Sequence, residues 1–257
     1  MSVSSQEVRA VKPLGIKAYG HIAHLPGSRL GPGDHRVHDG QARIATVKTR
    51  DRQDRVIVQE KLDGSCVAVA IVDGTLVALV RAGYPAFSSP YPQHHMFAVW
   101  VQQHESRFRN VLNDGERLVG EWLAQAHGTK YDLKYDTGTH DPFVAFDLMI
   151  GTSRVSFTQF KMRVMGAFAV PAVVADDYGE SCSVEQALEL LGPRGFHGAT
   201  ETIEGAVWRV ERKGKLDFLC KYVRPDKVDG CYLPEVSGKD AVWNWREDEA
   251  HATVTGE

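Results

Sequence analysis

The chain has 257 residues, of which 43% are hydrophobic and 25% charged, and a formal net charge of −3. This composition is ordinary for a soluble globular protein, and no stretch approaches the ~18 consecutive apolar residues of a membrane span. Any nucleic-acid partner would need a local basic surface, because the chain has no global basic character. The four cysteines are scattered without a CxxC pair, so we expect a reducing, cytoplasmic setting without a zinc site.

Residues 13–55 are rich in Gly, Pro and His, so we expect no long helix or strand there. Farther along the chain, Asp73-Gly74 joins two β-rich runs and predicts a hairpin. Ser183 and Gln186 form a capping box that predicts a helix start. Strands are predicted over 55–60, 66–72, 75–81, 116–124, 142–150, 204–210 and 216–223, and helices over 93–112, 157–169 and 183–192. This order favours an α+β fold with largely antiparallel sheets and flanking helices.

Lys61 stands at the head of an apolar run, in the stretch QEKLDGSCVAVA over 59–70. A free lysine amine has a pKa of ~10.4, so it needs desolvation or neighbouring positive charge before it becomes a nucleophile. Gly64 has no Cβ and would let a phosphate or the backbone come close. A solvated lysine before a turn explains the same segment, so these residues alone leave both interpretations open.

The segment Lys61-Leu62-Asp63-Gly64 matches KxDG, the nucleophile motif of the covalent nucleotidyltransferases, the superfamily of ATP-dependent ligases and mRNA capping enzymes. Segments resembling the superfamily's other motifs follow in order. They are the R-x-G element Arg81-Ala82-Gly83, the ribose-binding strand 120–123 with Glu121, the base-stacking segment 143–147 with Phe146, the metal-proximal element 204–208 with Glu204, and the last core motif with Lys221.

The resemblance implies a role for each of these side chains. Lys61 would be the nucleophile, with Lys221 and Glu204 as further catalytic residues. Glu204 would lie nearest a Mg²⁺ or Mn²⁺ ion, with Asp63 as a second metal candidate. The nucleotide, ATP as AMP donor, would be bound by Glu60, Lys61, Arg81, Glu121, Phe146, Glu204 and Lys221, with Lys215 as a further candidate. For Phe146, a place in the core of a strand is an equal alternative.

Glu60-Lys61 resembles the E-K-x-x-G pattern of phage and RNA-editing RNA ligases, in which the glutamate reads the adenine amino group. Only 36 residues follow Lys221, too few for the oligonucleotide-binding (OB) barrel that DNA ligases and capping enzymes normally append. The resemblance implies the nucleotidyltransferase (ATP-grasp-like ligase) fold without a C-terminal OB barrel. We expect an N-terminal extension over 1–55 packed on or over the active site, a core over 56–228 and a short C-terminal element over 229–257.

The implied function is ATP-dependent RNA ligation in RNA repair. Lysyl-AMP would form first, AMP would then pass to an RNA 5′-phosphate, and a 3′-hydroxyl would finally seal the ends. An end-healing kinase or phosphatase is an expected partner. A DNA nick ligase, another nucleotidyltransferase, or a non-catalytic nucleotide- or RNA-binding module of the same fold is the alternative.

Two further segments bear on phosphate binding. The last motif usually carries two lysines, but Leu219 occupies the first position here, so one phosphate contact is missing or replaced. A local excess of basic residues over 209–227 suits RNA phosphates, although such a run is also typical of a solvated face. The Gly/Pro/His segment over 21–40 is either a loop that brings His24 or Arg29 to phosphates or an Ω-like surface loop.

Overall fold

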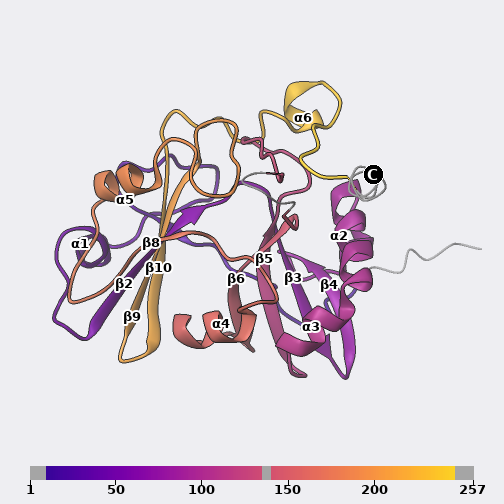
Figure 1. The fold of residues 1–257 in the computed structure, drawn as a ribbon, viewed down its shortest axis with the longest axis horizontal. Helices are drawn as coiled ribbons and strands as arrows, with labels where there is room; N and C mark the ends of the chain where they lie inside the picture. The colour runs from indigo at the N-terminus through magenta and orange to yellow at the C-terminus, as the bar shows by residue number, and fades with distance from the viewer. Residues whose placement is uncertain (1–9, 135–139, 247–257) are drawn as a thin grey trace, which may run out of the picture.

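The structure, a computed structural model, describes residues 10–134 and 140–246 and contains two five-stranded sheets (Figure 1). Sheet A has the order β1 (Ala23–His24), β10 (Lys215–Val223), β9 (Gly205–Arg212), β2 (Asp54–Lys61) and β8 (Val173–Tyr178). Sheet B has the order β4 (Thr75–Val80), β3 (Ser65–Val72), β5 (Glu116–Trp122), β6 (Phe143–Ile150) and β7 (Ser153–Arg154). Apart from the parallel β1–β10 pair, the neighbours in both sheets are antiparallel.

Helices flank both sheets (Figure 1). Around sheet B lie the 3₁₀ turn η1 (Ala86–Ser88), α2 (Pro92–Gln103), α3 (Glu105–Val111) and α4 (Phe157–Val164), and beside sheet A lie α1 (Asp39–Thr46) and α5 (Val184–Leu191), with α6 (Pro234–Ser237) near the C-terminal end. Neither sheet closes into a barrel within the described residues, and the α+β prediction is confirmed. No helix of the described residues is both long and apolar enough to cross a membrane.

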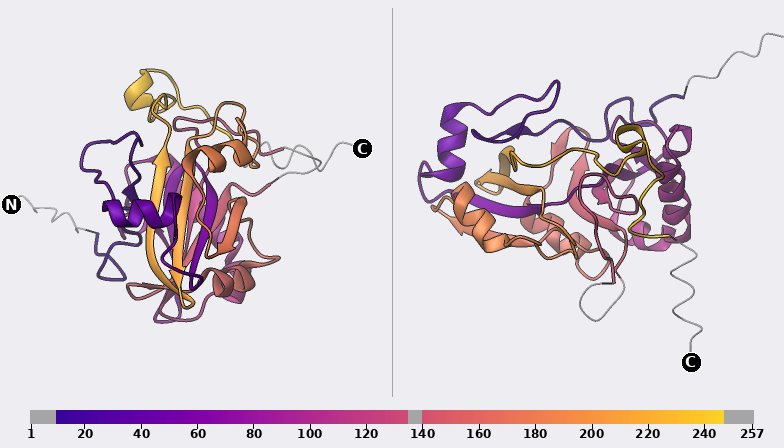
Figure 2. Two further views of the ribbon diagram at one scale, coloured as in Figure 1. Left: turned by 90° about the vertical axis from the view of Figure 1, so that its left-hand side faces the viewer. Right: turned by 90° about the horizontal axis from the view of Figure 1, so that it is seen from above.

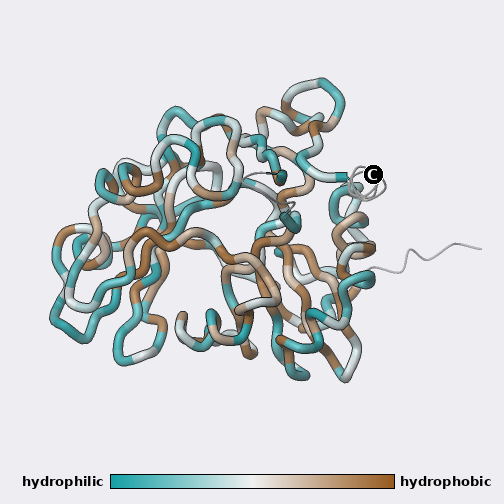
Figure 3. Tube along the Cα trace, viewed as in Figure 1, coloured by the Kyte–Doolittle hydropathy of each residue, from teal (hydrophilic) through white to brown (hydrophobic). Residues whose placement is uncertain are grey.

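Apolar side chains from the strands form the core. Figure 3 shows hydrophobic residues, in brown, along the strands of both sheets. One cluster joins sheet B to α2, α3 and α4 through residues such as Val69, Phe97 and Phe160. A second joins sheet A to α1 and α5 through Val58, Ala187 and Trp208. The alternation of side chains along β2 and β3 explains why each strand contributes to different clusters.

Four local predictions were wrong or incomplete. The helix expected over 93–112 is divided at His104, whose ring stacks on Trp100 at 4.2 Å and contacts the Trp100 carbonyl oxygen, in competition with the helical ladder. The helix expected over 157–169 ends at Val164, because Gly166 follows with φ +75°. Strand β8, with its Asp pair, and helix α1, which contains Gly40, were not predicted.

The N-terminal segment connects the two sheets. It adds β1 beside β10, and the Tyr19 N–H donates to the Arg81 carbonyl at 3.2 Å. The path of the segment can be followed by its indigo colour in Figure 2. A Cβ on Gly83 would lie 2.2 Å from the Ile16 carbonyl oxygen, so the glycine of the R-x-G element permits this crossing. The division into three regions stays a prediction, and residues 1–9 and 247–257 of its two terminal parts lie outside the described residues.

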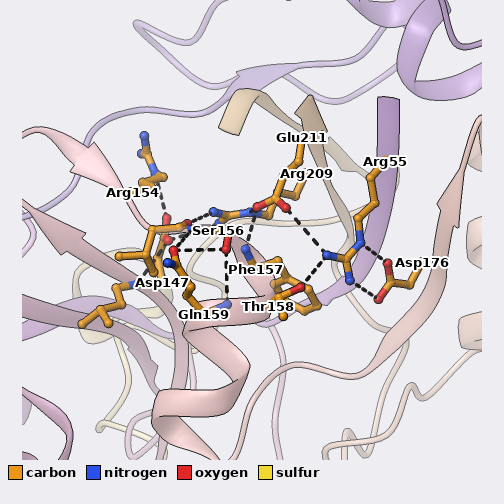
Figure 4. A network of polar contacts seen from close by, with 12 residues as sticks. Arg55, Asp147, Arg154, Ser156, Phe157, Thr158, Gln159, Asp176, Arg209 and Glu211 are labelled. Carbon is orange, nitrogen blue, oxygen red and sulfur yellow. Dashed lines mark hydrogen bonds and ion pairs between the residues drawn. The ribbon is translucent and has the colours of Figure 1, made fainter. Parts of the chain in front are cut away.

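A buried polar network also joins the sheets (Figure 4). Asp147 of β6 accepts a hydrogen bond from the Tyr19 hydroxyl at 3.1 Å and forms ion pairs with Arg154 at 2.7 Å and Arg209 at 3.2 Å. Arg209 of β9 continues to Glu211 at 2.8 Å. Because one carboxylate holds side chains from both sheets, this network fixes the floor of the space between them.

Candidate active site

A cavity of about 1230 Å³ opens where the two sheets meet. It is bordered by nearly all the side chains that the sequence singled out, namely Glu60, Lys61, Asp63, Arg81, Glu121, Phe146, Glu204 and Lys221. They come from strands that are far apart in the sequence. Motifs that are separated along the chain therefore line one wall of the cavity.

Lys61 and Glu204 form the closest pair in this wall. Lys61 ends β2 and lies opposite Gly205, the first residue of β9, so the strand register places Glu204 beside the amine. The Lys61 Nζ donates to Glu204 Oε2 at 2.5 Å. A Cβ on Gly205 would lie 1.9 Å from the Tyr222 carbonyl oxygen, so the glycine of the EG element lets β9 and β10 approach.

Burial and crowding of carboxylates shift the protonation of this pair. Burial alone would lower the pKa of Lys61, but the charges of Glu204, Glu121 and Asp63 outweigh it and raise that pKa above its ordinary value. Burial raises the pKa of Glu204 to about 7, against the opposing effect of Lys61. Burial likewise raises the pKa of Glu121 to about 7. The resting amine is therefore protonated, and both glutamates exchange protons near neutral pH.

Asp63 and Gly64 hold the loop after the nucleophile. Asp63 Oδ2 accepts from the Gly128 N–H and the Thr129 hydroxyl, both at 3.1 Å, and lies 3.3 Å from the Lys227 ammonium. A Cβ on Gly64 would lie 2.4 Å from the Trp122 carbonyl oxygen. The sequence allowed either a phosphate or the backbone to come close to Gly64. In the structure, the backbone of β5 lies close to it. These contacts leave Glu204 and Glu121 as the better-placed carboxylates for a metal.

Glu60 borders the cavity, but its carboxylate turns away from Lys61. Neighbouring residues of a strand point to opposite faces. The Glu60 side chain is fully buried, and its Oε2 lies 2.9 Å from both the Phe196 N–H nitrogen and His197 Nδ1. The other oxygen, Oε1, is buried without a hydrogen-bond partner among the described residues, and the role of Glu60 in reading adenine stays a prediction.

Lys221 faces the cavity from β10 and is flanked by the N-terminal segment. Burial and the nearby Lys61 charge lower the pKa of Lys221. Asp34 Oδ1 lies 4.0 Å from its ammonium, and His24 Nε2 lies 3.1 Å from Asp34 Oδ2. His24 is itself buried, so it holds Asp34 and does not reach into the cavity. The segment is a docked edge strand, and Arg29 pairs with Asp229.

Phe146 is half-buried and packs edge-on against Tyr19, with ring centroids 5.2 Å apart. Both rings border the cavity, together with Gln59 and Leu219. The Gln59 Nε2 is buried without a hydrogen-bond partner among the described residues. Tyr19 and Gln59 were not predicted, because neither lies in a recognised motif. The position of Gln59, two before Lys61 on the same strand face, is a signal that could have identified it.

Lys215 is not brought into the cavity. It begins β10, six residues before Lys221, which places the two lysines about 20 Å apart along the strand. The predicted basic surface is also largely neutralised. Arg209 pairs with Asp147, Arg212 with Asp54, and Arg224 with Asp226. Lys215 therefore does not replace the lysine missing at Leu219.

One family of known proteins matches most of this chain in sequence. The sequence pattern of the RNA ligase family matches residues 54–223. No curated protein matches the chain. The structure is similar to an archaeal ATP-dependent RNA ligase, with 20% identity over 67% of this chain and 43% of that chain and a TM-score of 0.43. It is also similar to a mutant Naegleria gruberi RNA ligase with ATP and Mn, with 17% identity over 79% of this chain and 59% of that chain and a TM-score of 0.50.

The likeness to the Naegleria gruberi ligase concerns the fold, and the chain spans less than two thirds of the length of either ligase. The family match, by contrast, extends from the start of β2 to the end of β10 and includes every motif that borders the cavity. This chain belongs to the RNA ligase family.

Proposed function

We propose that this chain is an ATP-dependent RNA ligase that seals 5′-phosphate and 3′-hydroxyl ends through lysyl-AMP and adenylylated-RNA intermediates. The observation that carries the proposal is the position of Lys61, whose amine lies in the cavity wall beside two glutamates. Lys221 and Arg81 border the same cavity and supply positive charge for phosphates. ATP and Mn in the related Naegleria gruberi ligase structure support the choice of nucleotide and ion.

In the first step the neutral amine of Lys61 forms a bond to the α-phosphorus of ATP. The bond from that phosphorus to the pyrophosphate oxygen breaks, and the amine proton passes to solvent. Lys221 and Arg81 meet the negative charge of the phosphoryl oxygens. Since Glu204 keeps the resting amine protonated, neutralising the charge of Glu204 is part of activation.

Glu204 and Glu121 fit a divalent cation. Both are carboxylates, the ligands that Mg²⁺ prefers, and both lie beside the nucleophile. The described residues contain no group of three or more ligating side chains, which suits an ion held by one or two carboxylates and the nucleotide phosphates. When bound, the ion supplies positive charge against Glu204 and the departing pyrophosphate.

End joining tests the proposal. Purified protein is incubated with ATP, magnesium and a 5′-³²P-labelled RNA that carries a 3′-hydroxyl, with the same sequence as DNA in parallel. We expect sealed or circular RNA, with adenylylated RNA accumulating at early times and little product from DNA. Equal or better sealing of DNA would make the chain a DNA ligase. Nucleotide binding without any covalent product would leave a binding module.

A further inference from the structure

The loop between β4 and α2 carries a cluster of exposed aromatic side chains that lysyl-AMP chemistry does not require. Tyr84 is 39% exposed, Phe87 53% and Tyr91 47%. We call these three side chains the aromatic rim. Soluble proteins seldom leave several large apolar groups together on the surface unless a partner covers them.

The aromatic rim is held in place by its own loop. The Val80 N–H donates to the Tyr84 carbonyl at 3.0 Å, and the Gly83 N–H to the Val80 carbonyl at 2.8 Å, which makes a tight turn. Tyr91 packs edge-on against His94, with ring centroids 5.7 Å apart. The rings are therefore presented on a fixed backbone.

The aromatic rim is continuous with the cavity that contains Lys61. Tyr84, Tyr91 and His94 border the same cavity as the nucleophile, and Arg81 begins the same loop. The cavity volume of about 1230 Å³ exceeds the roughly 300–1,000 Å³ typical of a small-molecule site, which leaves room beside a nucleotide.

Uncharged polar groups, among them Ser65 and His127, border the same cavity as the aromatic rim and Lys61. His127 Nε2 lies 3.3 Å from the Ser65 hydroxyl and 3.2 Å from Gln93 Nε2. Burial, with the nearby His127 and His95, lowers the pKa of His94 to about 4, so its ring is neutral at pH 7. Neutral donors and acceptors suit sugars and bases. Arg81 and Lys12, which lies 4.9 Å over the Tyr84 ring, carry the positive charge that suits phosphates.

We propose that the aromatic rim is the binding site for the unpaired bases at the end of a single-stranded RNA, which makes single-stranded ends, and not nicks in a duplex, the preferred substrate. Bases in a duplex are already stacked on their neighbours, whereas bases of a free strand can stack on aromatic side chains. The proposal rests on the proposed ligase function and adds the substrate class to it.

Binding of fluorescent RNA tests the proposal on the full chain. The probes are a 5′-phosphorylated single strand and the same strand held in a nicked duplex, both followed by anisotropy. The variant is Phe87→Leu with Tyr91→Leu, which removes two ring faces and keeps apolar bulk. The control is Tyr178→Leu, an aromatic at the far end of β8 that is 63% exposed and lies outside the cavity.

We expect the native protein to bind the single strand more tightly than the nicked duplex. The double variant should lose roughly tenfold in affinity for the single strand and little for the duplex. The control should resemble the native protein. An equal loss of affinity for both probes, or no loss for either, would overturn the proposal. A variant whose oligomeric mass differs from that of the native protein would also overturn it, because the aromatic rim would then be a protein interface.

The result is independent of the chemistry. A protein that forms no lysyl-AMP but still loses single-strand affinity in the variant would refute the ligase function and retain the aromatic rim as an RNA site. A protein that forms lysyl-AMP and seals nicks best would retain the ligase function and refute the substrate class proposed here.

Discussion

The two ends of sheet A are both rich in charge but differ in how that charge is balanced. At the end where β9 turns into β10, here the hairpin end, Asp54 is paired with Arg50 at 2.8 Å and Arg212 at 2.7 Å. Burial opposes ionisation there, but the hydrogen bonds from both arginines hold the pKa of Asp54 below its ordinary value. At the cavity end, Lys61 is surrounded by the carboxylates of Glu204, Glu121 and Asp63.

The difference separates a structural from a chemical use of charge. Two cations around one carboxylate fix Asp54 as an ion and stabilise the fold. Burial, together with the neighbouring carboxylates, gives Glu204 and Glu121 pKa values of about 7, so either can exchange a proton for another cation. The charges at the cavity end are thus less well balanced, and its groups are more reactive. Variants at the two ends test this difference directly.

The largest expected effect separates the two lysines of β10. Lys221→Ala should lower the rate of lysyl-AMP formation by roughly 10²–10³, because a charge that faces the transferring phosphoryl group is lost. Lys215→Ala, at the hairpin end, should leave the rate within about twofold. Single-turnover measurements with labelled ATP give both values. Equal losses in the two variants would contradict the placement of the site.

Stability should change in opposite directions at the two ends. Asp54→Asn leaves two arginines without their anion and should lower the free energy of unfolding by about 1–3 kcal/mol. Glu121→Gln should raise it by about 1–2 kcal/mol at pH 8, because the folded-state pKa is above that of the unfolded chain and ionisation costs stability as pH rises through 7. At pH 4 the Glu121 variant should match the native protein. Urea unfolding at both pH values measures these differences, and destabilisation by Glu121→Gln at pH 8 would refute the account of the cavity end.

Glu204→Gln should lower the pKa of Lys61, because the nearest negative charge is removed. Labelling of Lys61 by a small amine-reactive reagent in nucleotide-free protein should therefore begin about one pH unit lower. At a fixed pH, the labelling rate should be about tenfold higher. Peptide mass spectrometry locates the label. An unchanged pH profile would show that Glu204 does not control the nucleophile.

The native enzyme should form lysyl-AMP faster as pH rises. Only the ionised carboxylates would hold the divalent cation, whose charge would then offset theirs at Lys61. Glu204 and Glu121 have pKa values of about 7, so the ionised fraction of each rises about fivefold between pH 6 and pH 7. The rate should rise at least that much over this interval and continue to rise above it as the Lys61 amine loses its proton. A flat rate from pH 6 to pH 8 would argue against raised pKa values at the site.

Sequence reasoning located much of the site because strand ends carry the motifs. Lys61, Glu204 and Lys221 were each found from short patterns at the beginning or end of a β-rich run, and antiparallel pairing then brings such ends together. The sequence did not predict the direction of the Glu60 side chain or the distance of Lys215 from the cavity, for physical reasons. A motif says nothing about which face of a strand its neighbours occupy or about the 20 Å that about six residues of strand span.

Other features lacked any local signal. β8 carries Asp176 and Asp177, whose charges hide its strand character, and these side chains lie at the edge of sheet A. His127 is a single histidine in a loop, and only the fold brings Ser65 and Gln93 to its ring. The sequence shows the three aromatic residues of the rim, but only the structure shows that they are exposed beside the cavity.

Covalent labelling tests the central claim most directly. The protein and Lys61→Ala are incubated with magnesium and α-³²P ATP or, separately, α-³²P GTP, and are then denatured and run on a gel. The account predicts a band with ATP alone that survives denaturation and is absent from the Lys61 variant. A band that persists in that variant, or no band in folded protein free of bound AMP, would contradict Lys61 as the nucleophile.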